Sequence, residues 1–388
     1  MKILILDPSD LSSFGSGQIK KLLLTLSAFE ILNFEIILIT YYKFIVIQLN
    51  IMRTGTQSIS THVKKISLLR NLRPRTLSDI LVVLFVTFKY LLSRKYSSFD
   101  VVLLEHYNFA FLIPILRLLR HFTPIIYDAH AVEYELANQF FSKIAVLTHE
   151  LMAVRHSDII IVLSKADALQ LNHLYKVPLN KIAVIPLPMI NKLSKSLSNT
   201  MVQELKRKHK EKLAQLYGND ILCKPVIVFH GSLKYTPNKE AIDFIINALA
   251  PKFSDCIFVI IGPDPPYIGR RGNVIFTGFV KNISEILLAC DVAIIPVKRV
   301  TGVNMKVYDY IAYGLPIIAS RPILRWFDRG STEGIVIFTS LDSFEQMLRQ
   351  VLKEGYIRSG WIVERTLKEY AQDYALAILK ALRVRAQW

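Results

Sequence analysis

The stretch GVNMKVYDYIAYGLPIIAS, residues Gly302–Ser320, decides the fold. Ahead of it, Val292–Val297 is an apolar run with the length and the β-branched content of a buried parallel strand. Inside it, Lys306–Tyr313 has apolar residues at helical spacing, and Gly314 can take the positive φ with which many helices end. A second strand starts at Ile317–Ala319. The pattern therefore predicts strand, loop, helix and strand, which is the repeating unit of an open, doubly wound α/β sheet.

The loop that begins with Gly302 is a candidate site for an anionic ligand. In an open parallel sheet this loop lies at the carboxyl end of a strand, where ligands bind. The helix that follows directs its first N–H groups and a partial positive charge at the ligand, which favours phosphate. Lys306 in the first turn adds a full charge, and Asp309 offers a carboxylate that can accept ribose hydroxyls. The alternative is an ordinary strand–helix unit whose glycines only make turns.

Length and composition are those of a two-domain protein with buried sheets. A chain of 388 residues is long for one core and suits two domains. A hydrophobic content of 52% with a mean hydropathy of +0.34 fits parallel sheets, whose strands are buried on both faces. The longest apolar runs are too short to span a membrane or are broken by charges, and no signal peptide is evident. We therefore expect a cytoplasmic protein, in which the three cysteines are reduced and structural and show no metal-ligand spacing.

The net charge of +17 is unevenly distributed and suggests an anionic partner. Between Arg53 and Lys95, nine basic residues stand against one acid, Asp79, with leucine and phenylalanine residues among them. This mixture suits an anionic membrane surface, so we expect peripheral association with the inner face of a membrane. Nucleic acid is not expected, because the chain has no helix-turn-helix, zinc or aromatic RNA-binding pattern. A second basic run, Lys206–Lys212, can equally be a solvated surface.

Two further stretches place functional side chains after strands. The first strand, Lys2–Asp7, is followed by a loop with Gly15 and Gly17, which is similar to a dinucleotide-binding loop but lacks its full spacing. Pro124–Glu135, PIIYDAHAVEYE, is a strand that ends in a carboxylate and an imidazole. A lone histidine is more often structural, yet His130 follows a strand at the edge where ligands bind. His130 is therefore a candidate site residue, whereas the two glycines either contact phosphate or make a plain turn.

The stretch Gly302–Ser320 resembles the donor-nucleotide signature of the retaining glycosyltransferases of family 4 type (glycosyl transferases group 1), which have the GT-B fold. The family segment runs close to G-T-R-L-K-V-L-E-A-M-A-x-G-x-P-V-V. Asp309 stands where the family has its ribose-binding glutamate, and Thr301 stands at the family's other glutamate. The matching residues are Gly302, Lys306, Asp309, Ala312, Gly314 and Pro316.

Other segments resemble the family in the same order along the chain. Pro124–Glu135 is similar to Y-D-x-H-x-V-E, in which the histidine contacts the transferred sugar, so the resemblance gives that role to His130. Val274–Val280 is similar to a segment whose backbone holds the base of the nucleotide. The resemblance therefore implies main-chain hydrogen bonds to the base at Phe279 and Val280.

A turn at the start of the second domain resembles a phosphate-binding turn of the family. Gly231–Ala241, GSLKYTPNKEA, is similar to G-S-x-x-x-x-P-N-x-x-A. Other members clamp the pyrophosphate here with an arginine and a lysine, whereas this chain has Ser232 and Asn238 at those positions. The positive charge then has to come from another lysine, and the candidates are Lys306, which ranks first, Lys234 and Lys239.

The resemblance also implies the architecture, which is two doubly wound, Rossmann-like α/β domains that face a cleft. An acceptor-side domain is expected at residues 1–190 and a linker at 191–223. A nucleotide-sugar-binding domain is expected at 224–356, and a helix that crosses back to the first domain at 357–388.

The implied reaction moves a hexose or similar sugar from an NDP-sugar to a hydroxyl of a glycan or lipid-linked acceptor, with retention and without a metal or a cofactor. The catalytic candidates are His130, Lys306 and Asp309. The donor-binding candidates are Gly15, Gly17, Gly231, Ser232, Lys234, Gly262, Phe279, Val280, Gly302, Val303, Asn304 and Met305. Two other classes stay open, a catalytically degenerate GT-B binding protein and an NDP-sugar epimerase or hydrolase.

Overall fold

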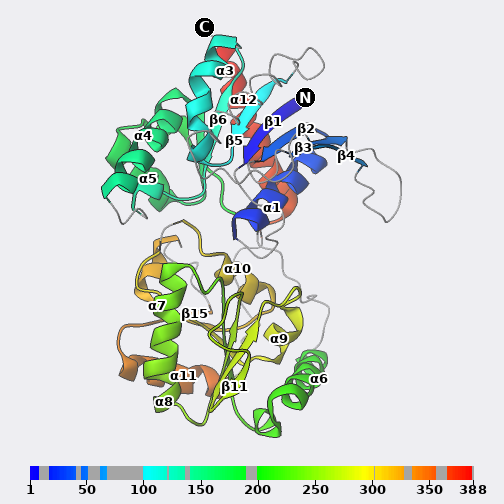
Figure 1. Cartoon of the computed structure of the whole chain (residues 1–388), viewed down its shortest axis with the longest axis vertical. Coiled ribbons are helices and arrows are strands. Elements are labelled where there is room, and N and C mark those ends of the chain that lie inside the picture. The colour runs from blue at the N-terminus through cyan, green and yellow to red at the C-terminus, as the bar shows by residue number, and fades with distance from the viewer. Residues whose placement is uncertain are drawn as a thin grey trace. The chain divides into compact units, whose positions relative to one another are not determined.

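The computed structural model describes residues 1–7, 17–40, 45–50, 62–67, 99–119, 122–135, 140–188, 199–300, 302–326, 334–354 and 365–386. The chain divides into two compact units, each with its own sheet (Figure 1). The first comprises Met1–Pro188, Thr301–Val303 and Thr366–Trp388, and the second comprises Met189–Val300 and Asn304–Arg365. Helices alternate with mainly parallel strands in both units, which confirms the predicted doubly wound α/β class.

The described strands of the first unit form one sheet in the order β4-β3-β2-β1-β5-β6-β7-β8. Strands β1, β2 and β5 to β8 run parallel to one another. Strand β3 runs antiparallel to both of its neighbours, β2 and β4. The strands are β1 (Lys2–Asp7), β2 (Glu35–Thr40), β3 (Ile45–Asn50), β4 (His62–Ser67), β5 (Val101–Leu104), β6 (Ile125–Ala129), β7 (Ile159–Val162) and β8 (Ile182–Val184).

The antiparallel edge formed by β3 and β4 is not predicted by the sequence pattern, which favours parallel strands throughout. Its outer strand, β4, includes Lys64 and Lys65 of the basic stretch 53–95. Lysines are common on edge strands because their charge hinders pairing with the edge of another sheet. The rest of that basic stretch lies outside the described residues.

The helices of the first unit connect its strands and cover its sheet. They are α1 (Gly17–Ile31), the short helix η1 (Tyr107–Leu112), α3 (Ile113–Leu119), the turn η2 (Glu133–Glu135), α4 (Phe140–His156), α5 (Lys165–Tyr175), the turn η3 (Leu179–Lys181) and α12 (Leu367–Ala386). Within the part of the chain that the structure describes, no helix combines the length and apolarity needed to cross a bilayer.

The described strands of the second unit form a sheet in the order β11-β12-β10-β9-β13-β14-β15, with β11 antiparallel to β12. They are β9 (Val226–His230), β10 (Ile257–Ile261), β11 (Gly269–Arg271), β12 (Val274–Gly278), β13 (Val292–Ile295), β14 (Ile317–Ser320) and β15 (Ile335–Phe338). The helices are α6 (Asn199–Tyr217), η4 (Asn219–Leu222), α7 (Thr236–Phe244) with a π-helical continuation η5 (Ile245–Leu249), α8 (Ala250–Lys252), α9 (Ser284–Ala289), α10 (Met305–Ala312), η6 (Arg321–Trp326) and α11 (Leu341–Glu354).

The predicted strand, loop, helix and strand of the signature stretch are present as β13, α10 and β14. The strands are continuous apolar runs because both of their faces are buried, and every residue of β13 is buried. Gly314 has a φ of +62° directly after the helix, as expected for a glycine helix stop. A polar residue can stand where such an apolar strand ends, and His230 is the last residue of β9.

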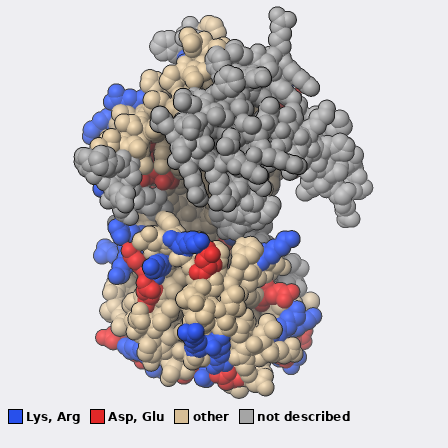
Figure 2. Space-filling model, in the orientation of Figure 1, with Lys and Arg blue, Asp and Glu red and all other residues tan. Residues whose placement is uncertain are grey.

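The predicted linker, residues 191–223, contains a helix that packs into the second unit. Leu213 of α6 is buried in the core of that unit. The nitrogens of Lys206 and Lys210 lie 2.6 and 3.4 Å from carboxylate oxygens of Asp291. The second basic run is therefore paired in part with acidic residues of its own unit, and Figure 2 shows both signs of charge interspersed over this unit.

The last described helix, α12, packs on the first unit beside α1, and is coloured red in Figure 1. Its face carries Tyr370, Tyr374 and Ala377, all buried. The ring of Tyr374 packs edge to face on Phe29 of α1, with ring centres 5.4 Å apart. The C-terminal helix therefore contributes both apolar area and a buried phenol to the first unit.

Candidate functional site

In the second unit, Lys306 lies against the turn that follows β9. Gly231 has a φ of +152°, and an added Cβ would lie 2.7 Å from Nδ2 of Asn238 and 2.8 Å from Cε of Lys306. Lys306 Nζ donates to Oδ1 of Asn238 at 2.8 Å, and Asn238 Nδ2 donates to the carbonyl oxygen of Ser232 at 2.8 Å. This φ is strained for any residue except glycine, and a side chain would also displace both groups. The structure thus brings Lys306 of the signature stretch against Gly231, Ser232 and Asn238 of the turn.

The N-terminus of α10 carries the remaining residues of the signature loop. Oδ1 of Asn304 accepts from the backbone N–H of Lys306 at 3.2 Å, so Asn304 is the N-cap of the helix. Gly302 is buried with a φ of +62°, and Val303 and Met305 are half-buried. Capping fixes the start of α10 and therefore the place from which Lys306 extends.

Asp309 lies beside a histidine that the sequence analysis missed. Its Oδ2 is 3.3 Å from Nε2 of His230, and both side chains are mostly buried. The hydroxyl of Tyr310 accepts from the backbone N–H of His230 at 2.9 Å, and the two rings meet edge to face. The sequence signal for His230 is its place at the end of an apolar strand, directly before Gly231.

Two other donor candidates belong to the turns of the same sheet. Gly262 follows β10, and an added Cβ there would lie 2.0 Å from the carbonyl oxygen of Gly231, so the two turns pack backbone to backbone. Lys234 forms an ion pair with Asp264 at 3.0 Å, and both side chains are largely exposed. Lys306 is therefore better placed than Lys234 to act at the turn.

Phe279 and Val280, the predicted contacts to the base, follow β12. The side chain of Phe279 is 57% exposed, whereas Val280 is half-buried against the core. An exposed aromatic ring directly after a strand is available to a ligand. Gly17 is the first residue of α1 in the first unit, and Gly15 and Thr301 lie outside the described residues.

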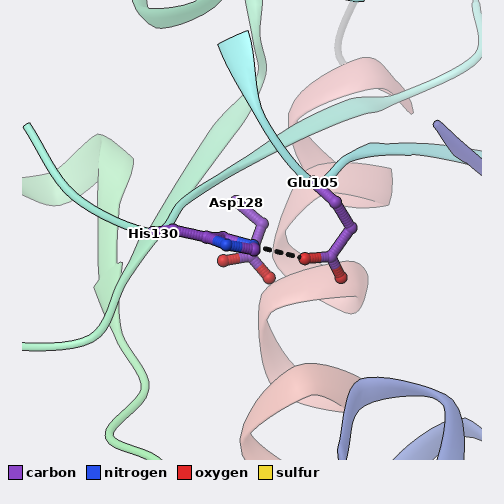
Figure 3. Close-up of side chains that lie close together, drawn as sticks. All are labelled: Glu105, Asp128 and His130. Carbon is purple, nitrogen blue, oxygen red and sulfur yellow. Dashed lines mark hydrogen bonds and ion pairs between the residues drawn. The ribbon is translucent and has the colours of Figure 1, made fainter. Parts of the chain in front are cut away.

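In the first unit, polar side chains meet where β5 and β6 end, and Figure 3 shows three of them, Glu105, Asp128 and His130. Nε2 of His130 lies 2.7 Å from Oε2 of Glu105. Lys21 of α1 donates to the same oxygen at 2.6 Å and also contacts Oδ2 of Asp128. The hydroxyl of Tyr374 donates to that oxygen of Asp128. We call these five residues the Lys21 cluster.

Electrostatics in the Lys21 cluster fix the charge of its members. Burial lowers the pKa of Lys21, but the carboxylates of Asp128 and Glu105 outweigh it and raise this pKa above its ordinary value. Burial raises the pKa of Asp128, although Lys21 opposes the shift. Burial and the positive charge of Lys21 hold the pKa of His130 well below its ordinary value. At neutral pH the lysine is therefore charged and the imidazole is neutral.

Glu105, Asp128 and His130 have the residue types of a metal site. One possible ligand atom from each lies within 4.8 Å of the others. However, the ammonium of Lys21 already contacts both carboxylates, and a metal ion would have to displace this buried cation. The donor set therefore fits an internal lysine better than a bound metal.

A second polar layer holds the loop after His130. The buried carboxylate of Glu150 accepts from the backbone N–H groups of Glu133 and Tyr134, at 2.9 and 3.2 Å, and from the hydroxyl of Tyr175. The side chain of Glu133 lies 3.3 Å from Nε2 of His106. The carboxylate of Glu133 therefore contacts a histidine next to the Lys21 cluster.

Lys21 and Tyr374 were missed by the sequence analysis. Lys21, Thr25 and Phe29 have the i, i+4 spacing of one helix face. This spacing places Lys21 on the same face as Phe29, and it is the feature of the sequence that could have indicated a buried lysine. Tyr374 comes from a helix more than two hundred residues away in the chain, so no local pattern relates it to Asp128.

Two family models match the chain, one in each unit. The model described as Glycosyltransferase Family 4 matches residues 55–189, and the model described as Glycosyl transferases group 1 matches residues 224–354. The chain is a glycosyltransferase of group 1 and family 4. This confirms the family that the resemblance of Gly302–Ser320 predicted.

Solved structures show which fold this glycosyltransferase has. The catalytic domain of starch synthase IV from Arabidopsis thaliana is 14% identical with a TM-score of 0.66, covering 98% of this chain and 99% of that chain. Sucrose-phosphate synthase from Thermosynechococcus elongatus is 14% identical with a TM-score of 0.65, covering 100% and 97%. HepE from Anabaena is 13% identical with a TM-score of 0.59, covering 100% and 98%. The predicted GT-B fold is therefore confirmed, and a search of curated protein sequences gave no match.

Proposed function

We propose that this glycosyltransferase transfers a sugar from a nucleoside diphosphate sugar to an acceptor hydroxyl. The proposal rests on the arrangement of Lys306, Gly231 and Asn238. An ammonium group, a glycine whose backbone is not covered by a side chain of its own, and a helix N-terminus lie together there. Two similar structures support the donor class, since HepE is described in complex with UDP and glucose, and starch synthase IV bound to ADP and acarbose.

The proposed transfer retains the anomeric configuration and needs no metal. The bond between the anomeric carbon and the diphosphate oxygen breaks, and the acceptor oxygen forms the new bond from the same face. The departing diphosphate oxygen takes the proton of the acceptor hydroxyl. Negative charge develops on the diphosphate, and Lys306 and the first N–H groups of α10 are fixed donors that stabilise it.

Two further side chains complete the proposal. Asp309 accepts hydrogen bonds from the ribose hydroxyls, and His230 beside it holds the carboxylate in place. His130 faces the transferred sugar. Replacing His130 by alanine should then reduce turnover strongly while NDP binds nearly as before, whereas an equal loss of NDP affinity would contradict this role.

We also propose a cytoplasmic enzyme that binds an anionic membrane surface and acts on a glycan or lipid-linked acceptor. The basic stretch 53–95 supports this, because each lysine or arginine near such a surface contributes about 1 kcal/mol. In the described part of the first unit, Leu118 and Phe122 are 84% and 70% exposed and can insert among lipid headgroups.

Sedimentation with vesicles tests the membrane proposal. We expect binding to anionic vesicles that weakens with salt, and loss of binding when Lys64, Lys65, Arg70 and Arg73 are replaced together by glutamine. Equal binding to neutral and anionic vesicles, or no binding to either, would contradict it.

A transfer assay tests the catalytic proposal. The full chain is incubated with UDP-, ADP- and GDP-sugars and a membrane lipid extract, with and without EDTA, and NDP release and the anomeric signal of the product are followed. We expect NDP release to require the acceptor and to continue in the presence of EDTA. The product should have the same anomeric configuration as the donor sugar. Release without acceptor would indicate a hydrolase, a changed sugar an epimerase, and donor binding without turnover a degenerate binding protein.

A further inference from the structure

We propose that Glu105 is a positioning residue for His130, which fixes the imidazole hydrogen on Nε2 and leaves Nδ1 as an acceptor for a substrate hydroxyl. The identity of that substrate rests on the proposed function, and the position of the hydrogen rests on the geometry of the Lys21 cluster.

The contact between the two residues defines the donor. Nε2 of His130 lies 2.7 Å from Oε2 of Glu105, which is a short distance for a nitrogen–oxygen hydrogen bond. A carboxylate oxygen can only accept, so Nε2 carries the hydrogen. In a neutral imidazole the other ring nitrogen then has a lone pair and accepts.

Lys21 pairs directly with the carboxylate of Glu105. Its ammonium donates to the same Oε2 at 2.6 Å and is 2% exposed. Asp128 shares this lysine and also accepts from Tyr374, so the second carboxylate of the cluster is engaged from α1 and from α12. Such a chain of hydrogen bonds in a buried setting holds each member in one orientation.

His130 is the member of the cluster that reaches the surface. Its side chain is 12% exposed, against 2% or less for Lys21, Glu105 and Asp128. Burial is the largest cause of the low pKa of His130; among the groups that face it, Lys21 of α1 and His106 lower this pKa further, and Asp128 of β6 and Glu133 oppose the shift. The cluster therefore presents one uncharged ring, held from behind by a carboxylate.

Glu150 provides a matched control for this role. It is also a fully buried carboxylate of the first unit, and it holds the backbone of the turn that follows His130. It bonds to backbone N–H groups and a phenol and not to the imidazole, so its loss should loosen the turn without selecting the other tautomer.

Nitrogen NMR of the full chain, labelled with ¹⁵N-histidine, tests the inference without any substrate. The His130 signals are assigned by comparison with H130Q, and spectra are recorded near pH 7.5 for the wild type, E105Q, E105D and E150Q. We expect the neutral Nε2–H tautomer in the wild type and in E150Q. E105Q should shift the signals toward a tautomer mixture, because an amide can donate as well as accept, and E105D should restore at least part of the wild-type pattern.

Turnover adds a second readout. E105Q should lower kcat about 10- to 100-fold with a smaller change in KM for the donor, as for partners that orient metal-bound histidines. A wild-type Nδ1–H tautomer, a charged imidazole, or unchanged His130 signals in E105Q would overturn the inference. If the NMR result is as expected but no variant transfers sugar, the proposed function fails and the positioning of His130 by Glu105 stands.

Discussion

A lysine belongs to the candidate site of each unit, and the two lysines have different surroundings. Lys21 of the first unit is buried and contacts the carboxylates of Glu105 and Asp128. Lys306 of the second unit is half-buried, extends from a helix N-terminus and donates to the neutral amide of Asn238.

This difference indicates two different functions for the same residue type. Two internal carboxylates offset the charge of Lys21, which compensates buried negative charge and orients its neighbours. Lys306 contacts an amide oxygen, and the partial charge of the helix N-terminus adds to its own charge. We propose that the second unit presents positive potential to an anion and the first a neutral, oriented imidazole.

The largest effect is expected from Lys21→Met. The substitution leaves two buried carboxylates without their cation, which should lower the free energy of unfolding by about 3–5 kcal/mol. Lys252→Met is the matched control, because Lys252 pairs with Asp342 and Glu345 at the surface, where solvent screens the pairs, so this variant should lose far less unfolding free energy. Denaturant titration measures both, and similar losses would remove the contrast between internal and surface lysines.

Lys306→Ala should have its main effect on catalysis and little effect on stability. Removing one charged donor from the leaving diphosphate should lower kcat/KM about 100-fold, or nearly 3 kcal/mol. Lys306→Arg should retain part of the activity, because it keeps the positive charge but replaces a compact ammonium by a planar guanidinium. Steady-state kinetics measure this, with Lys252→Ala as the control, and unchanged kinetics in Lys306→Ala would place the diphosphate elsewhere.

Tyr374→Phe separates the contribution of α12 from that of Lys21. It removes one hydrogen bond to the buried carboxylate of Asp128 and should cost about 2 kcal/mol of unfolding free energy. Tyr370→Phe removes hydrogen bonds to uncharged hydroxyls, those of Tyr374 at 3.3 Å and of Thr25, and should cost less. If the two variants lose the same unfolding free energy, the hydrogen bond from Tyr374 to Asp128 contributes no more than these contacts between hydroxyls.

The neutral imidazole of the first unit predicts a pH dependence of stability. The pKa of His130 lies well below its ordinary value in the folded chain, so below about pH 6.5 the unfolded state binds a proton that the folded state does not. The stabilisation is present above that pH and is lost as the pH falls, by up to about 1.4 kcal/mol per pH unit. Unfolding curves from pH 7.5 to 5.5 should show a steeper loss for the wild type than for H130Q; parallel losses would mean that His130 is charged when folded.

Much of the fold could be predicted because parallel strands leave a strong local pattern. β13, α10 and β14 follow the apolar runs and the glycine stop of one stretch, and every step of that pattern lies within thirty residues. The antiparallel pair β3 and β4 could not be predicted in the same way. β4 mixes charged and apolar residues, whereas β3 and its partner β2 are mostly apolar, a composition that suits parallel and antiparallel pairing alike.

Candidate site residues could be predicted where their position in a local sequence pattern was sufficient. Lys306 stands at a helix start, Asp309 one turn further along that helix, and His130 just after a strand, where position alone suggests a function. His230, Lys21 and Tyr374 have functions that depend on partners 79, 107 and 246 positions away in sequence, namely Asp309, Asp128 and again Asp128. Such contacts arise from topology, which a local pattern does not contain.

Calorimetric titration of free UDP, ADP and GDP into the wild type, Lys306→Ala and His130→Ala tests whether the second unit binds the nucleotide. We expect the wild type to bind at least one of these nucleotides. Lys306→Ala should weaken that affinity by about tenfold or more, and His130→Ala should leave it within about twofold. Equal affinities in all three proteins, or a loss confined to His130→Ala, would contradict the assignment of the nucleotide to the second unit.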